Sequence, residues 1–219
     1  MNRIIGLAAR GDGIADDGSF HALTAPGDTV REDGTIEPGP HHAAPACPHY
    51  GLCGGCQLQH IDDTAFAGFL RDRIRSALAA QGIAFDRFLD AHISPPRSRR
   101  RVSLTAERKG RNVQLGFNEA SSHRIVDLRS CAVIDARLEA MVPPLRRLLL
   151  AILPERKRAT IRMTCADQGV DLLMAGVDVE GLAAAEALMR FAEEHRLARL
   201  SVDEGYGPSA RWEPEPVSV

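Results

Sequence analysis

Three of the chain's five cysteines lie within ten residues, in the segment CPHYGLCGGCQLQH from Cys47 to His60. Glycine, proline and histidine surround them, and no hydrophobic periodicity runs through residues 41–62. This segment therefore has no core of its own to bury, and metal binding by the cysteines would order it. The odd number of cysteines argues against a complete disulfide framework.

The pair Cys53-Gly54-Gly55-Cys56 has the spacing of a redox dithiol, but no apolar strand precedes it, which disfavours that function. With Cys47 the spacing becomes Cx5CxxC, and three thiolates so spaced can wrap one metal centre. The glycines let the backbone turn tightly and direct N–H groups at sulfur. Zinc and iron–sulfur clusters use the same thiolates, so spacing alone leaves both open.

A zinc ion or a cubane cluster usually takes four ligands, so a fourth must come from elsewhere in the chain. Cys131 is favoured, because it follows a predicted strand and precedes a predicted helix, where a side chain can reach a loop. Cys165 lies within a predicted strand and is expected to be a buried core thiol. His49 is a further candidate, whereas His60 is expected to cap or pack against the helix that follows it.

Turn signals such as Asp17-Gly18 and Asp33-Gly34 break residues 1–40 into short apolar pieces, which predicts a small antiparallel β-barrel or meander. A helix is predicted from a cap at Asp62 to a stop at Gly82. Its apolar stripe is expected to be core, and its members are Phe66, Phe69, Leu70, Ile74 and Leu78.

Beyond residue 100 the pattern changes to strands and helices in alternation. Strands are predicted at VSLTA, VQLGF and HRIVDL, followed by a helical region from Asp135 to Ile152, two further strands, a helix over 180–195 and a last strand LARLSVD. Two strands, a helix and a strand make a small α+β unit. The predicted fold class is therefore α+β, with a β-barrel at 1–40, a cysteine-rich loop at 41–62 and a central α+β domain at 63–219.

The bulk properties restrict where such a chain acts. No apolar run approaches the roughly 18–20 residues that span a bilayer, and the N-terminus lacks the apolar core of a signal peptide. We therefore expect a cytoplasmic monomer without a membrane partner. The net charge is −2, yet residues 97–111 carry seven Lys or Arg against one acid. Such a local basic stretch fits a phosphate-docking surface, and a solvated charged face is the alternative.

Two segments together resemble a known family. CPHYGLCGGCQLQH and the later GFNEASSHRIVDLRSC, from Gly116 to Cys131, are similar to motifs of the RNA uracil-5-methyltransferases. The closer branch acts on ribosomal RNA and carries a 4Fe–4S cluster. The resemblance implies that Cys47, Cys53, Cys56 and Cys131 are the cluster ligands, and that residues 1–40 form a TRAM-like, OB-type barrel.

The resemblance also implies S-adenosylmethionine as cofactor and RNA as partner, with ribosomal RNA favoured over transfer RNA. The family's chemistry lies in a Rossmann-like domain, and this chain shows no Gly-rich cofactor loop, no Cys-Asn-Pro and no Asp-Pro-Pro-Arg motif. We therefore expect the chain to be the N-terminal part of such an enzyme, without the catalytic domain and inactive by itself. The alternative is a stand-alone RNA-binding module held together by zinc or a cluster.

Seven residues are predicted to contact RNA. Phosphate binding is expected from Arg99, Arg100, Arg101, Lys109 and Arg111, and base stacking or hydrogen bonding from Phe117 and His123. Core packing is the alternative for Phe117.

Overall fold

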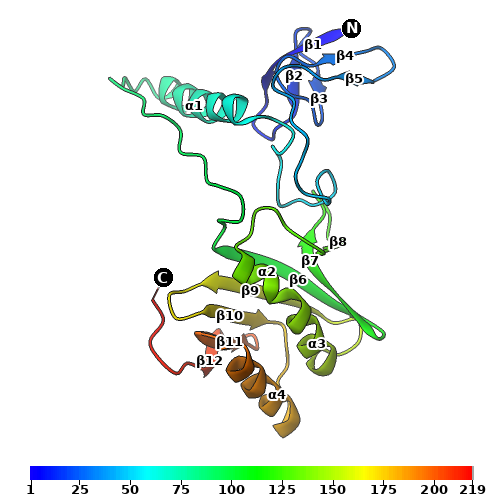
Figure 1. The fold of residues 1–219 in the computed structure, drawn as a ribbon, viewed down its shortest axis with the longest axis vertical. Helices are drawn as coiled ribbons and strands as arrows, with labels where there is room; N and C mark the ends of the chain where they lie inside the picture. Colours follow the sequence, from blue (N-terminus) through cyan, green and yellow to red (C-terminus); the bar gives the residue numbers. More distant parts are fainter. Residues whose placement is uncertain (219) are drawn as a thin grey trace. The chain divides into compact units, whose positions relative to one another are not determined.

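The structure is a computed structural model, and residues 1–218 are described. The chain divides into two compact units (Figure 1). The first comprises residues 1–51 and 56–94, and the second comprises Leu52–Gly55 and the chain from Pro95 onward. Among the described residues, no helix combines the length and apolar character needed to cross a bilayer.

The first unit contains a five-stranded antiparallel sheet in the order β3-β2-β1-β4-β5. Its strands are β1 (Asn2–Leu7), β2 (Gly13–Ala15), β3 (Phe20–His21), β4 (Thr29–Val30) and β5 (Ile36–Glu37). The predicted turns at Gly18 and Gly34 are confirmed, since both glycines have positive φ, at +84° and +82°. The buried core of the sheet is small and consists of Ile4, Ala15 and Val30.

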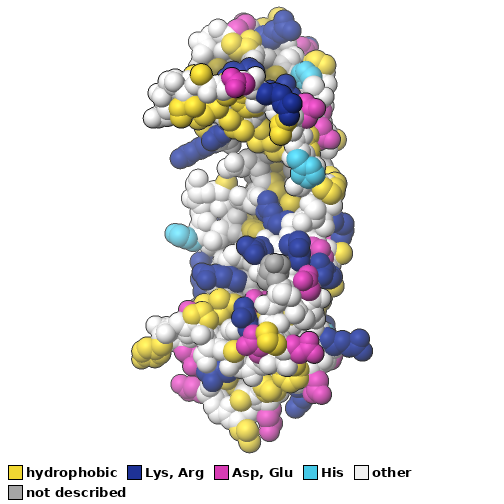
Figure 2. All heavy atoms as spheres, turned by 90° about the vertical axis from the view of Figure 1, so that its left-hand side faces the viewer, with side chains coloured by type: hydrophobic (Ala, Val, Ile, Leu, Met, Phe, Trp, Pro, Cys, Tyr) yellow, Lys and Arg dark blue, Asp and Glu magenta, His cyan; other side chains and the backbone are white. Residues whose placement is uncertain are grey.

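Helix α1 (Asp63–Ala80) belongs to the same unit and confirms the predicted helix. Asp62 caps it by accepting a hydrogen bond from the backbone N–H of Ala65 at 2.7 Å. The prediction that its apolar stripe is core is wrong, because no residue of α1 is buried and Ile74 is 53% exposed. Hydrophobic side chains accordingly reach the surface of the first unit in Figure 2.

The second unit contains a seven-stranded sheet in the order β12-β11-β10-β9-β6-β7-β8. Its strands are β6 (Arg101–Lys109), β7 (Asn112–Asn118), β8 (Ile125–Asp127), β9 (Arg158–Cys165), β10 (Val170–Ala175), β11 (Arg199–Asp203) and β12 (Pro208–Trp212). Only β10 and β11 pair in parallel, and helix α4 (Gly181–Glu194) provides the crossover that a parallel pair requires. Strand β12 was not predicted from the sequence.

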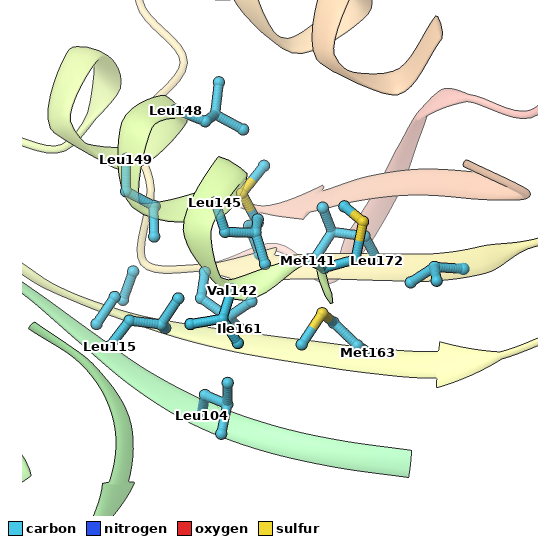
Figure 3. Packing of buried hydrophobic residues seen from close by; sticks show 14 of the residues in the cluster. Leu104, Leu115, Met141, Val142, Leu145, Leu148, Leu149, Ile161, Met163 and Leu172 are labelled. Atoms are coloured by element: carbon cyan, nitrogen blue, oxygen red, sulfur yellow. The ribbon is translucent and has the colours of Figure 1, made fainter. Parts of the chain in front are cut away.

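Helices α2 (Ala136–Ala140) and α3 (Val142–Ile152) lie with α4 against the sheet of the second unit (Figure 1). In Figure 3, Leu145 and Leu149 of α3 lie over Leu115 of β7 and Ile161 of β9, and all four are fully buried. The strands alternate, so that Leu104 is buried and its neighbours point away from the core. The other face of the sheet therefore presents polar side chains.

The predicted fold class, a barrel and a cysteine-rich loop followed by an α+β central domain, does not describe this arrangement. Strands β6 and β9 pair over seven residues, from Arg101↔Thr164 to Glu107↔Arg158, a long-range pairing that the sequence analysis did not specify. One continuous sheet results, and helix α1 belongs to the first unit. Local sequence patterns predict elements well but do not encode such long-range pairing.

Candidate functional site

The four predicted cluster ligands are divided between the two units. Cys47 and Cys56 belong to the first unit and are half-buried, whereas Cys53, also half-buried, and the buried Cys131 belong to the second. Within residues 1–218, no three His, Cys, Asp or Glu side chains are grouped so that they could hold a metal ion. Each unit contributes two of the four thiols, and four thiols are a donor set that suits zinc or an iron–sulfur cluster.

The Gly54-Gly55 pair shapes the backbone around Cys53. The N–H of Gly54 donates to the carbonyl of Asn118 at 2.9 Å, and the N–H of Gly55 donates to Sγ of Cys53 at 3.4 Å. A Cβ on Gly54 would lie 3.0 Å from the oxygen of Asn118 and 3.2 Å from the backbone of Ala120. Glycine therefore permits this close approach, and one N–H points at a thiol sulfur as the sequence analysis predicted.

Cys131 lies four residues after the end of strand β8 at Asp127 and is 6% exposed. Its backbone N–H donates to Oε1 of Glu139 at 2.8 Å, and Oε2 of the same carboxylate pairs with Arg97 at 2.6 Å. Glu139 thus fixes the backbone at Cys131 from helix α2. Sequence reasoning did not identify Glu139, because its role depends on where the helix lies.

Gln59 and His60 hold the segment that contains Cys47. Oε1 of Gln59 accepts the backbone N–H of Cys47 at 3.1 Å. His60 is 2% exposed, with Nε2 3.0 Å from the carbonyl oxygen of Thr24 and Nδ1 2.5 Å from the hydroxyl of Tyr50. A carbonyl can only accept, so Nε2 carries the proton. Nδ1 of the neutral ring is then an acceptor, and it shares the single hydroxyl proton of Tyr50 with the carbonyl of Gln57, 2.8 Å from that hydroxyl. His60 is thus a buried packing residue, as predicted, but it contacts Thr24 and Tyr50, and the cap of helix α1 is Asp62.

Burial sets the ionisation of these two side chains. Desolvation lowers the pKa of His60, although its contact with Thr24 acts in the opposite direction, and desolvation raises the pKa of the Tyr50 hydroxyl. Both groups are therefore neutral near pH 7, as the hydrogen bond between them requires. The pair joins the end of the cysteine segment to the loop that contains Thr24.

Cys165 is fully buried, as predicted for a core thiol. Burial raises the pKa of its thiol, and the nearby carboxylate of Asp135 adds to this effect. A thiol with a raised pKa is a poor nucleophile and a poor metal ligand. Cys165 is therefore the natural control residue for experiments on the other cysteines.

The predicted RNA-binding cations lie at opposite ends of strand β6. Arg99, Arg100 and Arg101 lie at its start, and Lys109 and Arg111 lie at the hairpin turn into β7. With a rise of about 3.3 Å per residue, the strand separates the two groups by about 26 Å. The structure therefore divides the basic stretch into two surfaces, and Figure 2 shows Lys and Arg side chains gathered on one face of the second unit.

The remaining predicted RNA contacts differ in exposure. His123 is exposed, and its carbonyl accepts a hydrogen bond from Arg158 at 3.0 Å. Phe117 is half-buried and packs against the core of the second unit. Arg100 donates to the carbonyl of Cys165 at 2.9 Å, whereas Arg99 and Arg101, exposed like Arg100, have no side-chain hydrogen bond or ion pair among the described residues.

Comparison with curated proteins finds similar RNA methyltransferases, although no family model matches the chain. The chain is 44% identical over all 219 residues to an uncharacterized RNA methyltransferase of Zymomonas mobilis, covering 55% of that protein. It is 38% identical over 203 residues to another from Caulobacter vibrioides, covering 49% of it. The chain is thus a homologue of bacterial RNA methyltransferases, and it spans about half the length of these curated relatives.

One similar protein has a more specific name. The chain is 32% identical over 163 residues to the 23S rRNA (uracil(1939)-C(5))-methyltransferase RlmD of Klebsiella pneumoniae, which corresponds to 73% of this chain and 36% of that protein. These matches support the RNA methyltransferase family. They do not establish the iron–sulfur branch within it.

A solved structure corrects the predicted fold class. The chain aligns over 99% of its length with 55% of the Pyrococcus abyssi tRNA (uracil-54, C5)-methyltransferase in complex with S-adenosyl-L-homocysteine, with a TM-score of 0.57 and 16% identity. The predicted fold class, an α+β chain without a Rossmann-like methyltransferase domain, is therefore wrong. That prediction was based on the absence of cofactor motifs from the sequence. A fold is defined by the arrangement of strands and helices, so missing motifs do not determine it. The match likewise does not support the predictions of a missing catalytic domain and an inactive chain.

Proposed function

We propose that this chain acts in S-adenosylmethionine-dependent methylation of uridine at C5 in RNA, with ribosomal RNA as the substrate class. The observation that carries the proposal is the 44% identity over all 219 residues to a protein named as an RNA methyltransferase. The 23S rRNA enzyme and the tRNA enzyme are both named for C5 of uracil, which supports C5 as the position that is methylated. Within this function we assign RNA recognition to the cations at both ends of β6.

The test measures binding and methyl transfer in one sample. The purified 219-residue chain is mixed with radiolabelled S-adenosylmethionine and either unmodified 23S rRNA or a transfer RNA transcript. For each RNA, a DNA of the same length serves as the control. We expect binding to RNA that weakens with salt and favours the ribosomal transcript. A chain that binds none of the RNAs above the DNA level would overturn the proposal.

A finer part of the proposal is that these 219 residues recognise RNA without transferring the methyl group. It is supported by the sequence, which contains neither a Cys-Asn-Pro nucleophile motif nor a Gly-rich cofactor loop. The same experiment tests it, since label appearing at C5 of uracil would contradict this part and still support the methyltransferase function.

We further propose that Cys47, Cys53, Cys56 and Cys131 are the ligands of a 4Fe–4S cluster. The spacing of the four thiols and the N–H of Gly55 directed at Cys53 support this set. When bound, the cluster would order the cysteine segment, and we assign it no step in methyl transfer. Gln59 and Glu139 would then fix the backbone at two of the ligands, Cys47 and Cys131.

Metal analysis of anaerobically purified chain tests the ligand set. We expect a brown protein with about four irons and four sulfides per chain. The variant Cys131→Ala should lose both, whereas Cys165→Ala should keep them. A colourless protein with one zinc per chain would instead support a stand-alone RNA-binding module, the second function that the cysteine spacing allows.

A further inference from the structure

A groove of about 550 Å³ lies in the second unit between the β6–β7 hairpin and helix α3. The hairpin contributes Lys109, Arg111, Asn112 and Gln114, and the helix contributes Arg146 and Arg147. Four cations thus line one concave surface, with Asp127 as the only carboxylate among the lining residues. Sequence analysis singled out the two hairpin cations and missed both helix arginines.

The two arginines of α3 differ in their surroundings. Arg146 is held in place, because its guanidinium pairs with Asp127 at 2.7 Å and donates to the carbonyl of Leu128 at 2.8 Å. It therefore neutralises the groove's carboxylate. Arg147 is exposed, and among residues 1–218 it has no carboxylate partner. It adds an uncompensated charge to the same surface.

Lys109 and Arg111 are likewise exposed and make no ion pair within the described chain. Elsewhere in the second unit, by contrast, Arg158 faces Glu107 at 2.8 Å and Arg199 faces Asp171 at 2.7 Å. Three unpaired cations converging on one groove create a positive potential that favours a polyanion.

Both walls of the groove are rigid. The hairpin is paired up to its turn, with Lys109 opposite Asn112, and Gly110 adopts the positive φ of +61° that the turn requires. Helix α3 is anchored on the sheet by the fully buried Leu145 and Leu149. Cations on rigid elements lose less freedom when a ligand binds than cations on mobile loops do.

We propose that this groove binds the sugar–phosphate backbone of RNA, with Arg147 as a phosphate contact that nothing in the sequence indicated. The neutral amides of Asn112 and Gln114 add donors and acceptors for phosphate oxygens and 2′-hydroxyls. No aromatic side chain lines the groove, so it suits the backbone and not stacked bases. This inference rests on the proposed RNA function and adds a location to it.

The experiment compares two single arginine variants. Arg147→Ala removes a groove cation. Arg190→Ala removes an arginine of helix α4 that is also exposed, has no ion pair among the described residues and lies outside the groove. Binding of a fluorescein-labelled 20-nucleotide RNA of mixed sequence is followed by anisotropy from 50 to 300 mM salt. We expect Arg147→Ala to bind about 5- to 10-fold more weakly, with the salt slope reduced by about 0.7–0.9, and Arg190→Ala to differ less than twofold.

Further variants and outcomes separate the two proposals. Arg147→Lys keeps the charge and should retain most of the affinity, and the double variant Lys109→Ala/Arg147→Ala should lose more than either single change. If the wild-type chain binds RNA and Arg147→Ala matches Arg190→Ala, the groove is not the site, whereas the proposed function stands. If the wild-type chain shows no salt-dependent RNA binding, both proposals fail.

Discussion

The side chain of Gln59 accepts the backbone N–H of Cys47 at 3.1 Å, so two residues twelve positions apart close the cysteine segment on itself. The second Gln of the QLQH stretch therefore orders one of the proposed ligands. His60 acts beside it, with both ring nitrogens engaged by Thr24 and Tyr50. The polar residues after the last thiol of the segment are thus part of the proposed site's structure.

Replacing Gln59 tests this relationship. We expect Gln59→Ala to lower the free energy of unfolding by about 1 kcal/mol, the net contribution of one hydrogen bond, and to lower the iron content per chain. Gln57→Ala is the matched control, since its side chain is exposed and makes no hydrogen bond among the described residues. Equal iron content in the two variants would show that the Gln59 bond does not support the site.

The buried imidazole of His60 predicts a pH dependence of stability. Its pKa is lowered by burial in the folded chain and returns to about 6.5 on unfolding, so the unfolded chain binds more protons below that pH. Stability should be constant above about pH 7.5 and fall as the pH drops through 6.5. Thermal unfolding of His60→Gln, measured between pH 7.5 and 5, should show a weaker dependence than wild type. An unchanged slope would contradict this assignment.

The cap of helix α1 gives a second pH-dependent prediction. The pKa of Asp62 is lowered in the folded chain by hydrogen bonds from Ala65 and His41. The carboxylate therefore contributes to the stability of the folded chain above pH 3.8, and this contribution is lost as the pH falls through the folded-state pKa. Asp62→Ala should lower the free energy of unfolding, measured with urea at pH 7, by about 1 kcal/mol. Asp63→Ala, an exposed residue of the first turn, serves as control. A cost that persists unchanged at pH 3 would show that the carboxylate charge is not its cause.

Gly116 of strand β7 lies opposite Asp127 of strand β8, with the backbone of β8 close to its Cα. A Cβ there would stand 1.9 Å from the carbonyl oxygen of Val126, so Gly116→Ala must force the two strands apart. We expect Gly116→Ala to lower the free energy of unfolding by about 1–3 kcal/mol, as is typical of overpacking. A Cβ added at Gly68 of helix α1 would meet no atom within 4 Å. Gly68→Ala should therefore raise the free energy of unfolding by about 0.5–1 kcal/mol. Equal effects at the two positions would contradict the close approach at Gly116.

The sequence predicted features that depend on neighbouring residues. The turns at Gly18 and Gly34 and the start of α1 at Asp62 follow from turn and capping chemistry within a few positions. The pairing of β6 with β9 joins residues up to 63 positions apart, from Arg101 to Thr164, and no local pattern encodes it. The apolar periodicity of α1 likewise predicted a helix but not its exposure, because periodicity does not specify what covers a face.

The same limit explains the incomplete prediction of the basic surfaces. Arg99, Arg100 and Arg101 are consecutive and therefore evident in the sequence, whereas Arg146 and Arg147 join the groove only through the fold. Arg146 depends on Asp127, 19 positions away. Charge runs along a chain thus locate candidate cations but do not group them into sites.

The start of β6 provides the last prediction. Replacing Arg99, Arg100 and Arg101 by Ala together should weaken RNA binding and reduce the salt slope by about 0.7–0.9 for each cation that contacts a phosphate. Arg100 donates to the carbonyl of Cys165, so a thermal melt must first show that the triple variant is folded. Arg99→Ala/Arg101→Ala keeps that bond and removes the two cations whose side chains have no partner among the described residues. If the double variant binds RNA like wild type at 50 mM salt, this end of the strand does not contact RNA, and the groove at the other end would be the binding surface on this sheet.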